Sequence, residues 1–179
     1  MRPFLLLASA ASLALAASPA EASKAGWNRA SNISRTIVVG ASLAVPAFQQ
    51  DWRGLGGTGL ALGLTAATTQ GLKWAIPETR PDRSDNQSFP SGHTSISFAA
   101  AASLHKRYGW QAGLPAYAIA GFTGLARVEA DKHYTHDVLA GAVLGTAAGW
   151  LLNSRKDASV ECLPWTAHHG AGLSMTSRF

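Results

Sequence analysis

Ten residues in three short runs have the types and spacing of a site for a tetrahedral oxyanion. The runs are Lys73-x6-Arg80-Pro81, Pro90-Ser91-Gly92-His93 and Arg127-x5-His133-x3-Asp137. Guanidinium and ammonium groups bind phosphate oxygens, and arginine can grip two oxygens at once. Histidine supplies a nucleophile or an acid near neutral pH. These residue types predict phosphoryl transfer through a histidine, without a metal ion.

The spacing within the runs suggests individual roles. Asp137 follows His133 by one helical turn, so it can accept from one ring nitrogen, fix the tautomer and stabilise the imidazolium. This support favours His133 as the nucleophile. Ser91 either caps a helix or donates its hydroxyl to a phosphoryl oxygen. Beside the other two motifs, we expect the phosphate contact, with Gly92 leaving room for the oxyanion.

The three basic residues of the motifs are interpreted as clamps on the phosphate charge. For Lys73 the alternative is a side chain that snorkels from a helix end. For Arg80 the alternative is a solvated loop charge, which is the interpretation given to Arg83. Arg127 completes the set of clamps.

The three motifs together resemble those of the type 2 phosphatidic acid phosphatase family, which shares its site with vanadium haloperoxidases and class A bacterial acid phosphatases. The resemblance runs from about Leu60 to Leu152 and departs from the family pattern at Ala126, where the family usually has serine. It implies that His133 forms a phosphohistidine, which water hydrolyses, and that His93 protonates the leaving group. It further implies no cofactor and a set of phosphate-binding residues: Lys73, Arg80, Ser91, Gly92 and Arg127. Loss of one hydroxyl donor at Ala126 lowers the expected turnover.

The N-terminus has the pattern of an export signal. Arg2 precedes an apolar stretch from Phe4 to Ala17, and Ala20-Glu21-Ala22 has the form of a cleavage site. The alternative is an uncleaved first membrane helix, for which the stretch is short. The expected division is therefore a signal peptide (1–22), a phosphatase domain (23–157) and a C-terminal tail (158–179).

The cysteine content and the net charge exclude some classes of protein. Cys162 is the only cysteine, so no internal disulfide can form. The formal net charge is +5, but no run of Lys and Arg exceeds two residues. Together with export, this argues against nucleic acid and favours an anionic phosphorylated substrate or an anionic membrane surface. No obligate protein partner is evident.

Hydrophobic patterns and short connections predict an all-α fold, an antiparallel bundle of about five core helices. The expected helices run from about Ile33 to Phe48, Trp52 to Ile76, Thr94 to His105, Gln111 to Arg127 and Thr135 to Asn153. Alternating helix direction then places the motif residues at one end of the bundle. The second helix is rich in glycines that permit close helix approach: Gly54, Gly56, Gly57, Gly59 and Gly63.

The tail breaks the helical pattern. Turns are expected at Pro164, His168, His169, Gly170 and Gly172. The segment from Leu173 to Phe179 is either a strand or disordered. The pair His168-His169 is interpreted as solvated rather than as a metal site.

Charge placement favours a membrane-embedded bundle. The last two helices have uncharged stretches at the lower edge of the roughly 17–25 residues that a span requires. Basic residues lie at the helix ends away from the motifs, which is a positive-inside arrangement: Arg53, His105-Lys106-Arg107 and Arg155-Lys156. We therefore expect an inner-membrane protein with a periplasm-facing site; the alternative is a soluble periplasmic bundle.

These features favour a phosphatase that hydrolyses phosphate monoesters or diphosphates, mainly of lipids. The family suggests phosphatidic acid, phosphatidylglycerol phosphate, undecaprenyl diphosphate and lipid A phosphates, and nothing in the sequence selects among them. The alternatives are a soluble non-specific acid phosphatase, a vanadium haloperoxidase and a non-catalytic phospholipid-binding module. Asp131 and His136 match nothing in the family pattern and are expected at the mouth of the site.

Overall fold

The computed structural model describes residues 23–156, 160–167 and 170–177. The predicted signal peptide, residues 1–22, lies outside these ranges, as does the pair His168-His169. The described part begins with five helices and ends in a two-stranded hairpin.

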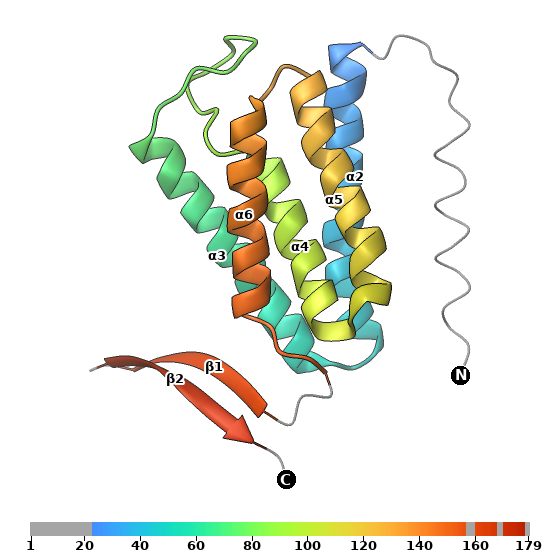
Figure 1. The fold of residues 1–179 in the computed structure, drawn as a ribbon, viewed down its shortest axis with the longest axis vertical. Coiled ribbons are helices and arrows are strands. Elements are labelled where there is room, and N and C mark those ends of the chain that lie inside the picture. The colour runs from blue at the N-terminus through green and yellow to red at the C-terminus, as the bar shows by residue number, and fades with distance from the viewer. Residues whose placement is uncertain (1–22, 157–159, 168–169, 178–179) are drawn as a thin grey trace.

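The helices form an antiparallel bundle around a central helix (Figure 1). Their bounds are α2 Lys24–Phe48, α3 Trp52–Ala75, α4 Gly92–Tyr108, α5 Trp110–Glu129 and α6 Thr135–Leu151. Helix α4 contacts all four others and packs most extensively against α6 and α5. The expected all-α bundle of five core helices is confirmed.

The first helix begins at Lys24, well before the expected start at about Ile33. The hydroxyl of Ser23 caps it by accepting from the backbone N–H of Gly26. Its first two turns are mainly polar, which is why hydrophobic periodicity places the start too late. The correction matters because these turns lie at the motif end of the bundle.

Glycines allow close helix packing, but mainly on α6 rather than on α3. A Cβ added at Gly145 would lie 2.0 Å from the carbonyl oxygen of Ser95 on α4. Gly141 and Gly149, one turn to either side, meet the α4 backbone in the same way. On α3, Gly54 and Gly57 are crowded as expected, whereas three other glycines have nothing within 4 Å: Gly56, Gly59 and Gly63.

The bundle buries small and polar side chains and exposes large apolar ones. Its fully buried residues are mostly alanine, serine and threonine. Large apolar side chains are exposed along the outer faces of α2, α3, α5 and α6: Ile33, Ile37, Leu60, Leu64, Leu114, Leu125, Leu139 and Val143. Among the described helices, none combines the length and the apolar character needed to cross a membrane.

The tail forms an antiparallel hairpin of β1 Val160–Ala167 and β2 Gly170–Ser177. Pro164 and Gly172 therefore lie within strands, where we had expected turns. Within the described ranges the strands pair only with each other.

Candidate active site

The motif residues come together at one end of the bundle, the upper end in Figure 1. The end of α3 and the starts of α4 and α6 lie there, with the end of α5. Two loops, residues 76–91 and 130–134, close over this end. The backbone N–H of Asp82 donates to the carbonyl of Asp131, and the side chains of Asp82 and Lys132 form an ion pair.

His133 is buried, with 2% of its surface exposed, and both ring nitrogens face motif residues. Its Nε2 lies 3.3 Å from a terminal nitrogen of Arg80, and its Nδ1 lies 3.5 Å from Oδ2 of Asp137. Because a guanidinium can only donate, Nε2 must be the acceptor, and the proton of the neutral ring belongs on Nδ1. This tautomer leaves Nε2 unprotonated, so its lone pair can attack phosphorus once the Arg80 guanidinium donates to the substrate oxygens instead.

The electrostatic surroundings keep His133 neutral. Burial, and then the positive charges of Arg127, Arg80 and Lys73, hold the pKa of His133 well below its usual value, against the opposing charge of Asp137. Burial disfavours the charged imidazolium, and so do like charges nearby. The ring is therefore unprotonated at neutral pH, as a nucleophile must be.

Asp137 is fully buried and organises its surroundings through one oxygen. Its Oδ2 accepts from the hydroxyl of Ser88 at 2.6 Å and from the backbone N–H of Tyr134 at 2.9 Å. The second contact completes a capping box at the start of α6. Ser88 is not among the sequence motifs, although it holds the carboxylate that faces His133.

Backbone and carboxylate oxygens hold Lys73 and Arg80 at the site. The Nζ of Lys73 donates to the carbonyls of Gln87 at 2.5 Å and Ser88 at 3.2 Å. Arg80 donates to Asp85 from Nε at 2.7 Å and to the Lys132 carbonyl at 3.2 Å. The Arg80 side chain is only 15% exposed, so it is not the solvated loop charge considered as its alternative, and Lys73 reaches from the end of α3 to the loop before α4.

The loop before α4 brings Ser91 and Gly92 to the same place. Ser91 is the N-cap residue of α4, yet its side chain makes no capping hydrogen bond. Its buried hydroxyl lies 2.9 Å from that of Thr94 instead. A Cβ added at Gly92 would lie 3.9 Å from Cε of Lys73, which is ordinary contact, so protein packing alone does not require glycine here. Ala126 is fully buried in α5.

Helix α2 contributes two contacts that the sequence motifs do not reveal. Nε2 of His93 lies 2.6 Å from Oδ1 of Asn32, and Arg127 donates to Oδ1 of Asn28 at 2.5 Å. Arg127 is only 4% exposed, and its Nε has no hydrogen-bond partner among the described residues. A buried donor of this kind is available to a bound oxyanion. Asn28 and Asn32 lie one turn apart on α2, but this spacing alone does not indicate that they face Arg127 and His93.

His136 lies beside the site between two carboxylates. Its Nε2 is 2.9 Å from Glu78 and 3.2 Å from Oδ1 of Asp137. The potential ligand atoms of these three residues lie within 4.8 Å of one another. This group shares Asp137 with the phosphate site, so it is not a set of ligands left over beyond that site. An N–H of His136 can donate to Glu78, whereas Oδ1 of Asp137 has no hydrogen-bond partner among the described residues.

The chain is similar to known proteins over more than half of its length. The model of the PAP2 superfamily matches residues 54–160, more than half of the chain. The chain is 31% identical over 129 residues to a lipid A 1-phosphatase of Porphyromonas gingivalis, which covers 67% of this chain and 29% of that protein. It is 32% identical over 117 residues to a lipid A 4'-phosphatase of Helicobacter pylori, covering 59% of each. The chain thus spans less than two thirds of the length of either relative.

Two solved structures share the fold. The crystal structure of LpxE from Aquifex aeolicus matches with a TM-score of 0.63 at 21% identity, covering 76% of this chain and 87% of that one. A transmembrane PAP2-type phosphatidylglycerolphosphate phosphatase from Bacillus subtilis matches with a TM-score of 0.59 at 23% identity, covering 81% of each chain. The helical bundle and its order of elements are therefore those of known proteins.

Proposed function

The chain belongs to the PAP2 superfamily, and from this we propose that it is a phosphatase that hydrolyses a phosphate monoester or diphosphate of a lipid. The observation that carries the proposal is the setting of His133. A buried neutral imidazole has Arg80 at Nε2 and the Asp137 carboxylate at Nδ1. This is the arrangement of a nucleophile that becomes positively charged as it attacks.

In the first step, Nε2 of His133 attacks phosphorus and the bond to the leaving oxygen breaks. His93 gives its proton to that oxygen, so an alcohol or a phosphate leaves rather than its anion. The proton on Nδ1 of His133 stays there, and Asp137 stabilises the resulting cation. Lys73, Arg80 and Arg127 balance the negative charge on the phosphoryl oxygens. The unpartnered Nε of Arg127 is one donor for this purpose.

In the second step, water attacks the phosphohistidine and the nitrogen–phosphorus bond breaks. His93, now neutral, accepts the proton of the water. Inorganic phosphate leaves, and both histidines return to their starting states. Asn32, at 2.6 Å from Nε2 of His93, holds that ring where the leaving group departs.

A lipid substrate is supported by the relatives and by the outer surface of the bundle. The relatives are named for the two phosphates of lipid A, so a phosphorylated glycolipid is the substrate class to test first. Large apolar side chains cover the outside of the helices, as suits contact with lipid. We place the protein at the inner membrane with its site toward the periplasm; a soluble periplasmic phosphatase is the alternative.

The proposal is tested by phosphate release from purified protein. The panel contains lipid A, phosphatidylglycerol phosphate, phosphatidic acid and p-nitrophenyl phosphate, each with and without EDTA. We expect release from at least one lipid, retention of activity in EDTA, and inhibition by vanadate.

His133→Ala should abolish both release and an acid-labile phosphoenzyme. Activity that disappears in EDTA and returns with a divalent ion would favour a metal at Glu78, His136 and Asp137 instead. Release from soluble esters alone would support the soluble alternative.

A further inference from the structure

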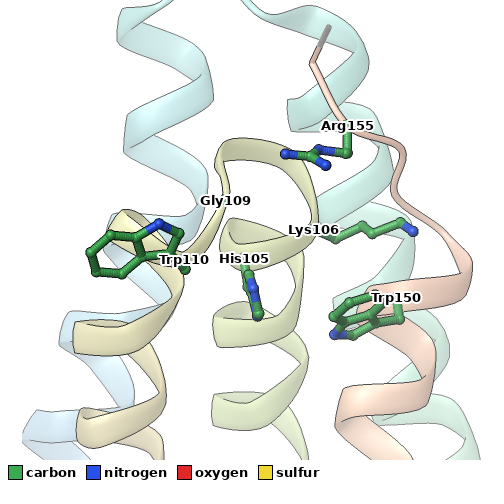
Figure 2. A pocket seen from close by; sticks show the side chains of 6 residues that line it. All are labelled: His105, Lys106, Gly109, Trp110, Trp150 and Arg155. Atoms are coloured by element: carbon green, nitrogen blue, oxygen red, sulfur yellow. The ribbon is translucent and has the colours of Figure 1, made fainter. Parts of the chain in front are cut away.

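A second recess lies at the opposite end of the bundle from the histidines. It is formed where α4 ends, α5 begins and α6 ends (Figure 2). Its volume is about 290 Å³, close to the lower end of the range for small-ligand sites. Six residues line it: His105, Lys106, Gly109, Trp110, Trp150 and Arg155. No residue of the phosphate site is among them.

The lining carries positive charge and no carboxylate. The Nζ of Lys106 lies over the ring of Trp150, 4.8 Å from its centroid. A cation–π contact of this kind holds the ammonium in place without neutralising it. Arg155 reaches toward the same recess (Figure 2). Within the described part of the chain, neither Lys106 nor Arg155 forms an ion pair with an acidic residue. The recess is therefore suited to an anion.

Aromatic rings hold His105, one of the lining residues, in place. The ring of His105 is fixed by edge contacts with Tyr117 and Trp150, with centroids 5.7 Å and 5.4 Å away. Its Nδ1 is buried and has no hydrogen-bond partner among the described residues. These ring contacts give the recess a rigid aromatic wall beside its two cations.

Apolar side chains lead from the recess along the outside of the bundle. Leu114, 65% exposed, follows Trp110 by one turn of α5. On α6, Val143 and Leu139 are 70% and 61% exposed, and their spacing places them on the same face as Trp150. An anion site that continues into two apolar stripes has the shape of a lipid with a charged headgroup. Free phosphate would occupy only the anion site and would not contact the apolar stripes.

We propose that this recess binds the headgroup of an anionic phospholipid, whose acyl chains lie along the stripes on α5 and α6. The bound lipid is not the substrate, because the recess and the catalytic histidines lie at opposite ends of α4. The site needs only that the protein meets anionic lipid, so it does not depend on the phosphatase activity. The two cations suit the anionic headgroup of the lipid, and the two indoles suit the boundary between the headgroup and the acyl chains.

The test measures lipid binding to the full chain purified in neutral detergent, with vanadate present to fill the phosphate site. The probes are dihexanoylphosphatidylglycerol, dihexanoylphosphatidylcholine and glycerol 1-phosphate, compared by isothermal titration. We expect the phosphatidylglycerol to bind at least tenfold more tightly than the other two. Removing each charge should weaken it about fivefold. The double variant Lys106→Gln, Arg155→Gln should therefore lose at least tenfold.

The matched control is Lys156→Gln, because Lys156 lies at the same end of the bundle but does not line the recess. Its Nζ donates to Gln49 instead. We expect less than a twofold change for this variant, and an unchanged midpoint of thermal unfolding in both variants shows that they fold. Equal binding of the two lipids, an equal effect of Lys156→Gln, or equal binding of glycerol 1-phosphate would each overturn the proposal.

Discussion

The positive charge of Arg80 disfavours the imidazolium form of His133, and in the proposed mechanism the same charge binds the phosphate. Because the pKa of His133 is lowered by burial and by three cations, the wild-type acid limb of kcat/KM should lie well below pH 6.5. Arg80→Gln removes one of these charges, so the pKa rises and the limb moves to higher pH. The pH dependence of kcat/KM is measured with p-nitrophenyl phosphate. The pH at which the acid limb lies does not depend on the lower overall rate of the variant.

Arg83→Gln is the control for this prediction, because Arg83 lies exposed in the same loop. It should leave the acid limb in place and change kcat/KM less than threefold. If the limb shifted equally in both variants, a general change in net charge would be the cause. If it stayed in place in Arg80→Gln, then Arg80 would not act on the free His133 ring.

Asn32 is expected to be a positioning residue for His93. Asn32→Ala should lower turnover most for esters with poor leaving groups, such as alkyl phosphates, because these depend on the proton from His93. Turnover of p-nitrophenyl phosphate should fall less. Thr36→Ala, one turn further along α2, is the control, since the Thr36 hydroxyl donates to the backbone carbonyl of Asn32 and leaves the Asn32 side chain to His93. An equal loss for both leaving groups would indicate a structural role alone.

The motif residues of the site could be predicted from sequence. The residues of α2 that hold their side chains in place could not. Spacing places His133 and Asp137 one turn apart, and alternating helices bring Lys73 to the same end. Asn28 and Asn32 belong to a helix start that has no apolar periodicity. Their contacts with Arg127 and His93 depend on how α2 packs sideways against α5 and α4. Spacing within one segment carries no information on such packing.

At the scale of the elements, the contact between α4 and α6 depends on glycine. Gly145→Ala would place a methyl group against the Ser95 backbone, and backbone cannot move as a side chain can. We expect a loss of about 1–3 kcal/mol, as for other overpacked sites. Gly63→Ala meets nothing within 4 Å and should be neutral or stabilising by up to about 1 kcal/mol. Thermal unfolding of the two variants in the same detergent checks both values.

A buried ion pair joins the far ends of three helices. Arg107 donates to both oxygens of Asp51, at 2.6 Å and 2.7 Å, and also to the carbonyl of Ser154. The hydrogen bond from Arg107 holds the pKa of Asp51 below its usual value. The stabilisation is therefore present above the ordinary pKa of about 3.9 and is lost as pH falls through the lower folded value.

Asp51→Asn removes the buried carboxylate that accepts two hydrogen bonds from Arg107, so we expect a loss of about 3–5 kcal/mol at neutral pH. Asp131→Asn is the comparison, because the pair of Asp131 with Lys24 is largely exposed and should contribute at most about 1 kcal/mol. Unfolding in urea at pH 7 measures both. Similar losses in the two variants would show that burial does not strengthen the Asp51 pair.

The positions of the helices could be predicted from sequence because their turns and apolar stretches are clear. The faces they bury could not, since the buried side chains are small or polar. On α3, Gly59 and Gly63 are open while Thr65 and Thr69 are buried. Glycine content alone thus indicated that helices approach closely but not which residues meet.

At the scale of the whole molecule, the two ends of the bundle present different charged groups. One end presents the phosphate site, and the other presents Lys106 and Arg155 beside exposed indoles. If the bundle lies in the inner membrane with positive charges inside, Asn86 and Thr135 face the periplasm. Single cysteines at these four positions, in a Cys162→Ser background, report the arrangement.

A membrane-impermeant maleimide applied to intact spheroplasts should label only the cysteines at Asn86 and Thr135, because lipid shields the other two positions from it. After permeabilisation all four should react, which shows that the unlabelled pair is accessible in principle. Equal labelling of all four before permeabilisation would indicate the soluble periplasmic bundle. Labelling only at Lys106 and Arg155 would invert the orientation and place the histidines in the cytoplasm, where they could not act on an outer-leaflet lipid.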